Sequence, residues 1–143
     1  MLGIFLRCLA AAAALGLSAG SAPAAETVRL EAAGSVLEAE VARSRAQLER
    51  GLMGRPALPE GRAMLFVFPH PSGWCMWMKD TPAPLSIAFV SEDGRVISVE
   101  PMQPFSTRLH CPPEPAAYGI EAPAGSLEKR GLRPGVRVQG LPR

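Results

Sequence analysis

The sequence predicts a mainly β domain, a mostly antiparallel β sandwich or barrel-like fold with two short helices. Short apolar segments separated by glycine, proline and acidic turn residues recur along the chain, and no stretch has the spacing of alternating strands and long helices. The 143 residues, once shortened by an N-terminal segment that resembles a signal peptide, suffice for one hydrophobic core. We therefore expect a single β-rich domain over residues 26–143.

Residues 1–25 have the features of a secretory signal peptide. Arg7 supplies the positive charge, residues 9–17 form an apolar run, and small residues precede a cleavage point after Ala24 or Ala25. The apolar run is shorter than the roughly 20 residues that span a bilayer, so no stable membrane insertion is expected after cleavage. The sequence predicts a periplasmic or secreted protein.

The first elements of the domain are predicted to be a hairpin and a helix. Residues 27–31 and 36–41 alternate apolar and charged side chains, as strands with one solvated face do, and Gly34 lies in the turn between them. Ser44 followed by Gln47 is typical of a capping box, which indicates a helix of two to three turns.

The middle of the chain is predicted to contain four strands. The continuous apolar run 63–68 indicates a central strand covered on both faces, and residues 74–79 are the next strand candidate. Residues 85–90 and 95–100 flank an acidic turn with Gly94 at the position that favours a left-handed conformation, so they predict a β-hairpin.

The last third is predicted to begin with an extended loop. Residues 101–115 contain five prolines, which neither donate to a sheet nor continue a helix. Residues 117–122 are expected to return as a strand, Ser126 to cap a helical turn that ends at Gly131, and residues 136–139 to form a final strand.

Charge and cysteine content limit the function classes. The formal net charge is only +2 and no cluster of Lys and Arg forms a stripe, so a nucleic-acid partner is not expected. Beyond the signal peptide the chain has two cysteines, Cys75 and Cys111, which in an oxidising compartment predict one disulfide. Its 36-residue loop would contribute about 3 to 4 kcal/mol to stability.

Five ordered blocks of sequence resemble one protein family. The blocks are GLMGRPALP (51–59), AMLFVF (63–68), WMKDTPAPL (77–85), AFVSEDGRV (88–96) and GLRPGVRV (131–138). Together they are similar to domain of unknown function 192, also called uncharacterised protein family 0127. The resemblance implies a compact, mainly β domain of a kind often exported from bacteria. It implies no reaction, substrate or cofactor.

The chain departs from the family pattern at two positions. Asp80 stands where the family usually has Asn, and Ser86 stands where it commonly has Asp. An essential carboxylate at position 86 is therefore ruled out. The two cysteines lie outside the blocks that carry the resemblance and are a local addition.

Residues 74–80 hold the strongest candidates for a binding site. If 74–79 is a strand, Trp77 and Lys79 share one face, and they could recognise a ligand together with Asp80. Arg50 is a possible contributor to such a site. The alternative is that both faces are buried and Lys79 extends its ammonium to an edge.

Two other function classes remain open. A periplasmic copper protein could use the soft ligands Met76, Met78, His70 and His110, although their spacing matches no common metal motif. A cell-envelope hydrolase or transferase could pair a cysteine with a histidine, but the usual catalytic motifs are absent and no catalytic residue is assigned.

The leading hypothesis is an exported, non-catalytic module. We expect it to be a monomer without a cofactor that binds a small ligand or an envelope protein through Trp77, Lys79, Asp80 and Arg50. The ligand does not follow from the sequence.

Overall fold

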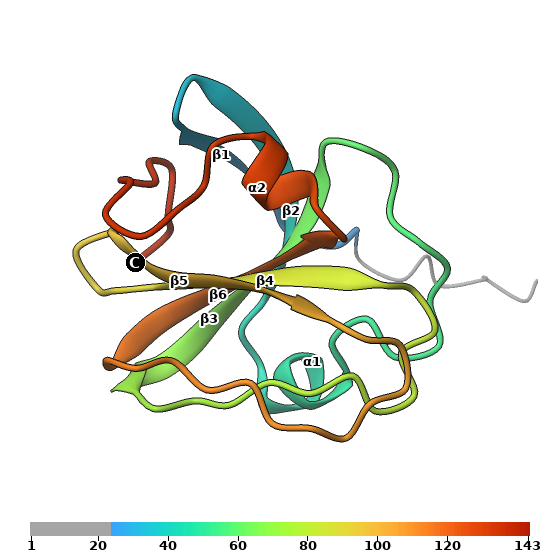
Figure 1. Cartoon of the computed structure of the whole chain (residues 1–143). Helices are drawn as coiled ribbons and strands as arrows, with labels where there is room; N and C mark the ends of the chain where they lie inside the picture. Colours follow the sequence, from blue (N-terminus) through green and yellow to red (C-terminus); the bar gives the residue numbers. More distant parts are fainter. Residues whose placement is uncertain (1–23) are drawn as a thin grey trace, which may run out of the picture.

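The protein is described by a computed structural model that covers residues 24–143, so the predicted signal peptide lies outside the described residues apart from its last two positions. The predicted fold class is confirmed: one domain, mainly β, with two short helices (Figure 1). The elements in chain order are β1 (Thr27–Ala32), β2 (Ser35–Ala42), α1 (Arg45–Arg50), β3 (Arg62–Ser72), β4 (Leu85–Val90), β5 (Val96–Met102), β6 (Ala116–Pro123) and α2 (Ser126–Lys129).

The six strands form one sheet in the order β1-β2-β3-β6-β4-β5. All neighbours are antiparallel except β2 and β3, which run parallel because α1 and the loop after it carry the chain back to the start of β3. Strand β6 lies at the centre, between β3 and β4, although it is last in sequence. The β4–β5 hairpin has the predicted turn, with Gly94 at a φ of 85°.

The C-terminal segment closes the sheet on itself. Residues 136–139 are not the strand that their composition predicts, because they make isolated bridges to Glu31 of β1 and to Arg95 just before β5 instead of a ladder with one strand. Gln139 exchanges two backbone hydrogen bonds with Glu31 of β1, and the amide of Val96 in β5 donates to Val136. These bridges cover both edge strands, which gives the sheet its barrel-like form.

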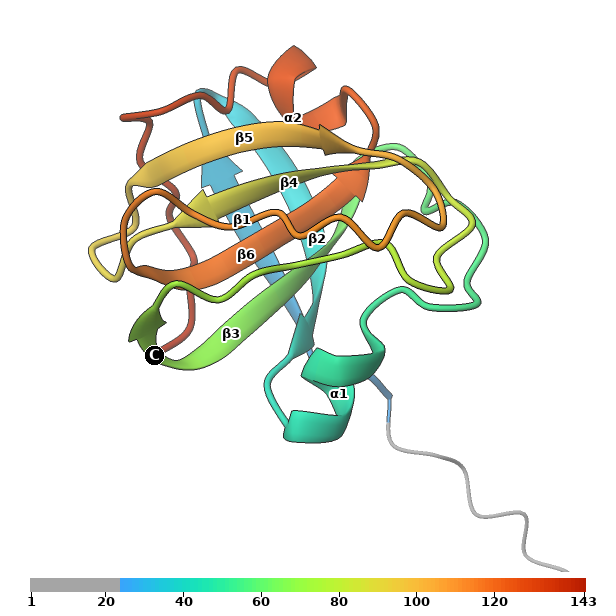
Figure 2. The ribbon, with the colours of Figure 1, turned by 60° about the horizontal axis from the view of Figure 1, so that its bottom comes forward.

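Each face of the sheet packs against its own apolar cluster. The interior cluster contains Leu30, Leu65 and Ile120, and the outer cluster contains Phe66 and Phe89 together with residues of α1 and the loops. Alternation along β3 therefore supplies both clusters, as expected for a continuous apolar run. Helices α1 and α2 lie on opposite sides of the sheet (Figure 2).

Both helices are short, and only one begins as predicted. Ser44 and Gln47 form the full capping box at the start of α1, with the Gln47 amide donating to the Ser44 hydroxyl at 3.2 Å. The prediction that Ser126 caps α2 is wrong, because Gly125 precedes the helix and Ser126 is its buried first residue. Within residues 24–143, no helix is long and apolar enough to cross a membrane.

Candidate functional site

The Trp segment, residues 74–79, is extended but is not the predicted strand. Among residues 24–143, its only sheet-like pairing is a bridge between Met76 and His110, and no long stretch of this part of the chain lies in register beside it. The predicted alternation nevertheless holds: Met78 is fully buried, whereas Trp77 is 43% exposed and Lys79 is exposed. One side of the segment packs on the outer cluster and the other faces solvent.

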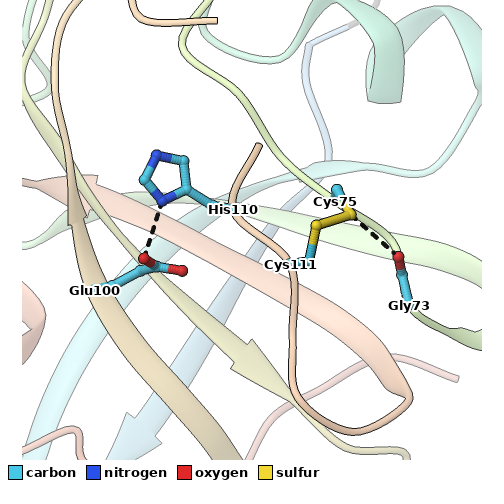
Figure 3. The surroundings of a disulfide bond; sticks show 5 residues. All are labelled: Gly73, Cys75, Glu100, His110 and Cys111. Carbon is cyan, nitrogen blue, oxygen red and sulfur yellow. Dashed lines mark hydrogen bonds and ion pairs between the residues drawn. A yellow bond between two sulfur atoms is a disulfide. The ribbon is translucent and has the colours of Figure 1, made fainter. Parts of the chain in front are cut away.

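A disulfide fixes the Trp segment against the loop that follows β5. Cys75 and Cys111 are bonded, with their Cα atoms 4.2 Å apart, and the next residue pair, Met76 and His110, exchanges two backbone hydrogen bonds of 2.8 Å. The Nδ1 atom of His110 lies 3.0 Å from a carboxyl oxygen of Glu100 in β5, to one side of the disulfide (Figure 3). The loop is therefore anchored at both the Trp segment and the sheet.

A cleft of about 560 Å³ opens between α1, the Trp segment and the outer face of the sheet. Four aromatic side chains line it: Phe66, Phe68, Trp74 and Trp77. Aliphatic and thioether side chains complete its walls, namely Leu48, Leu52, Met53 and Met76. Gly51 lets α1 end close to the sheet, because it has a φ of 47° and a Cβ there would lie 3.1 Å from the Phe66 ring.

The ring of Trp74 is held in place on two sides. It stacks on Phe68 with 5.8 Å between ring centroids, and its indole N–H donates to the His70 carbonyl at 2.7 Å. Both tryptophans of the chain line the cleft. The intrinsic fluorescence of the protein is therefore a direct report on this site.

Sequence reasoning missed the acidic side chain on the floor of the cleft, Glu121. It is the only charged residue in β6, it is 3% exposed, and its neighbours across the sheet are Met64 and Ile87. Burial in this apolar setting raises the pKa of Glu121 to about 8. A single glutamate within an apolar strand was the signal available in the sequence.

The rim of the cleft is basic. Arg43 pairs with Glu26 at 2.9 Å, and Arg45 pairs with Glu49 at 2.7 Å. Arg50 also lines the cleft, and within residues 24–143 it makes no ion pair within 4.0 Å. Its guanidinium is therefore available to an incoming anion.

The four predicted binding residues do not all meet at one site. Trp77 and Arg50 both line the cleft. Lys79 places its ammonium 5.6 Å from the Trp77 ring centroid and does not line the cleft. Asp80 lines a shallower depression shared with Arg50, and its carbonyl accepts a hydrogen bond from Gly54.

The candidate metal ligands are dispersed. Met78 is enclosed in the outer cluster and Met76 lines the cleft, while exposed His70 lies 5.3 Å from the Trp74 ring and His110 is buried beside Glu100. The part of the chain that the structure describes contains no group of three or more His, Cys, Asp or Glu residues suited to a metal ion.

Ser86, where the family pattern commonly has Asp, lies on the other side of the sheet from the cleft. Its hydroxyl donates to Glu128 of α2 and accepts from the Gly125 amide, both at 3.0 Å. The residue therefore joins β4 to α2.

Fold and cleft together define a class of protein: a small, closed mainly β domain with an aromatic cleft beside a disulfide-bonded loop. The chain belongs to the DUF192 family, described as Uncharacterized ACR, whose sequence profile matches residues 28–140. The resemblance seen in the five sequence blocks is thereby confirmed.

Two solved structures are similar over most of the chain. A protein of Sinorhizobium meliloti 1021, provisionally described as a transcription regulator, is 32% identical with a TM-score of 0.78, over 84% of this chain and 98% of that one. A protein of unknown function from Novosphingobium aromaticivorans DSM 12444 is 28% identical with a TM-score of 0.76, over 84% and 94%. No curated protein matches the chain in sequence.

Proposed function

We propose that this protein is an exported, non-catalytic binding module that holds a small, largely apolar ligand in the cleft between α1 and the Trp segment. The observation that carries the proposal is the cleft itself, about 560 Å³ in volume and walled by four aromatic side chains. Small-molecule sites are typically concave, mostly apolar and provided with a few polar groups that orient the ligand. Glu121 and Arg50 are such groups.

The rigidity of the walls supports ligand binding. Trp74 is fixed by its stacking on Phe68 and by its hydrogen bond to His70, and the disulfide at Cys75 anchors the adjoining residues. A wall that is ordered before binding loses little conformational entropy when the ligand arrives.

The chemistry of the lining supports a non-catalytic role. Cysteine catalysis needs a free thiolate and a neighbouring base. Cys75 is bonded to Cys111, and the lining residues of this cleft include no histidine. The remaining polar groups are suited to holding a ligand.

Export is part of the proposal, and it rests on the N-terminal sequence and on the disulfide. Disulfides persist in oxidising compartments such as the periplasm. Expression of the full chain in a Gram-negative host should place the protein in the periplasmic fraction, with an intact mass that begins at Ala25 or Glu26. Retention of residues 1–23 in the purified protein would contradict export with cleavage.

Ligand binding is tested by a fragment screen that follows the two indole N–H signals in ¹⁵N NMR spectra of the mature protein. Compounds that enter the cleft should shift the signals of both Trp74 and Trp77. Leu48→Phe fills the cleft from α1 and should abolish these shifts. Leu141→Phe makes the same change against the interior cluster and should leave them intact. A screen in which no compound moves either indole would refute the proposed function.

A further inference from the structure

Glu121 occupies an unusual place for an acidic residue. It lies on β6, the central strand, and its register partners Met64 and Ile87 belong to the outer cluster, so its side chain faces the cleft side of the sheet. The residue is 3% exposed and lines the cleft. Its carboxyl group is therefore a polar group on the otherwise apolar floor of the cleft.

The carboxyl group of Glu121 has no protein partner. Within residues 24–143, its side chain is in no ion pair within 4.0 Å and no side-chain hydrogen bond, and the residues opposite it are apolar. Its oxygens are not among the fully buried unpaired atoms of this part of the chain, so they open into the cleft. Buried polar groups are nearly always paired, and an unpaired one costs folding free energy. An orphaned carboxyl that faces a cleft points to a ligand that completes it.

The protonation state of Glu121 decides which ligand group fits. Because burial raises its pKa to about 8, the group is a neutral carboxylic acid at pH 7 and can donate a hydrogen bond. The charged groups around the cleft are Arg43, Arg45, Glu49 and Arg50, all from α1 or the residue pair before it, whereas β3 and β4 present only apolar side chains to Glu121.

These rim charges favour an anion over a cation. The pairs Arg43–Glu26 and Arg45–Glu49 are each neutral overall, which leaves the positive charge of Arg50. A cationic ligand would be repelled by Arg50, and to pair with it Glu121 would have to ionise in apolar surroundings, which costs free energy. An anion meets a guanidinium that is suited to carboxylates.

We propose, as a refinement that rests on the proposed function, that the cleft binds small apolar anions with a hydrogen-bond-accepting oxygen at the inner end. Arg50 pairs with the anionic group at the mouth, Trp74 and Trp77 flank the apolar body, and the O–H of Glu121 donates a hydrogen bond to the inner oxygen. Glu121 and Arg50 thereby become residues that determine ligand specificity.

Three matched probes test this assignment. 4-Acetylbenzoate carries both the anion and the inner acceptor, 4-ethylbenzoate lacks the acceptor, and 4-acetylbenzylamine replaces the anion with a cation. Titrations at pH 6.5, followed by the indole N–H signals of Trp74 and Trp77, should give 4-acetylbenzoate an affinity about tenfold above either of the others, the worth of one good hydrogen bond or ion pair.

Variants separate the two contacts. Glu121→Met should make 4-acetylbenzoate and 4-ethylbenzoate bind equally, and Arg50→Gln should remove the preference for the benzoate over the amine. Glu121→Gln keeps a donor of the same size and should retain the preference for the acetyl group. In the wild type that preference should fall about tenfold between pH 6.5 and pH 9 as Glu121 ionises, and in Glu121→Gln it should not change.

The outcomes distinguish the refinement from the proposed function. If the amine binds most tightly, with affinity that rises with pH, or if all three probes bind equally to wild type and Glu121→Met, the refinement is overturned while ligand binding in the cleft stands. If no probe and no screened fragment shifts either indole, both are overturned.

Discussion

Arg55 and Glu40 form a two-pronged ion pair that ties the chain after α1 to strand β2. Two guanidinium nitrogens of Arg55 donate to the two carboxyl oxygens of Glu40 at 2.7 and 2.9 Å. The hydrogen bonds from Arg55 are the main reason that the pKa of Glu40 lies below its usual range. The pair spans the crossover between parallel strands β2 and β3, and this crossover carries α1 and one wall of the cleft.

Arg55→Lys should destabilise the fold by about 1 kcal/mol at pH 7, because the single nitrogen of an ammonium cannot replace the two parallel hydrogen bonds of the guanidinium. The loss is small because solvent partly screens the pair. The contribution of Glu40 is present above the ordinary pKa of glutamate and is lost as the pH falls through the lowered pKa, so wild type and variant should converge in acid. Urea unfolding at pH 7 and pH 3 measures the difference.

The control for this variant is Arg45→Lys, which alters the exposed Arg45–Glu49 pair of α1 and should leave the unfolding midpoint unchanged. Equal losses in the two variants would show that the Arg55–Glu40 geometry adds nothing specific.

Local sequence patterns correctly predicted the elements whose contacts join residues close together in the sequence. The β4–β5 hairpin follows from two apolar runs around a turn with Gly94, and the start of α1 follows from the Ser44–Gln47 spacing, since both depend on residues a few positions apart. The Trp segment failed as a strand for the opposite reason. A strand needs a partner in register, and only His110 supplies one.

The role of Glu121 could not be predicted because it depends on strand order. A glutamate in an apolar strand is harmless at a sheet edge, where its carboxyl reaches water. Strand β6 instead lies between β3 and β4, and that order arises from pairs of residues 28 to 57 positions apart. Arg50 and Trp77 were predicted as binding residues, and the structure brings them to one cleft. The position of Glu121 in the same cleft follows only from the strand order of the fold.

Burial of Glu121 should make the protein less stable as the pH rises, the opposite of the effect of a carboxyl group whose pKa is lowered by folding. Its pKa is raised from 4.5 to about 8 in the folded state, so the folded protein binds more protons than the unfolded chain between these values. The free energy of unfolding should therefore fall as the pH rises from 4.5 to 8, by up to about 5 kcal/mol from this group.

Glu121→Gln should remove this slope, because an amide does not titrate. Urea unfolding from pH 4.5 to pH 9 should show the variant gaining stability over wild type as the pH rises. Glu38→Gln, an exposed change in β2, is the control and should keep the wild-type slope. A wild-type curve that is flat over this range would mean that Glu121 ionises normally.

Closure of the sheet by the C-terminal segment is tested at Gly140. A Cβ there would lie 2.1 Å from the backbone oxygen of Arg29 in β1, and the residue has a φ of 85°. Gly140→Ala should cost more than about 2 kcal/mol, because the clash with fixed backbone adds to the conformational strain. Gly135→Ala has a similar φ of 92° but open space, so it should show the strain alone, about 1 kcal/mol. Equal losses would mean that the segment does not pack against β1.

The Cys75–Cys111 disulfide should stabilise both the whole fold and the wall of the cleft. It closes a loop of 36 residues, for which the chain-entropy estimate is about 4 kcal/mol. Cys75→Ser with Cys111→Ser should lower the free energy of unfolding by about this amount in urea, and wild type treated with a phosphine reductant should match the double variant.

The loss also has a local component, because the bond adjoins the Met76–His110 bridge that holds the loop after β5. Amide exchange at Met76 and His110 should therefore accelerate more than exchange in β3 and β6. Uniform acceleration across the sheet would instead assign the entire effect to the unfolded chain, with no role for the bond in shaping the cleft.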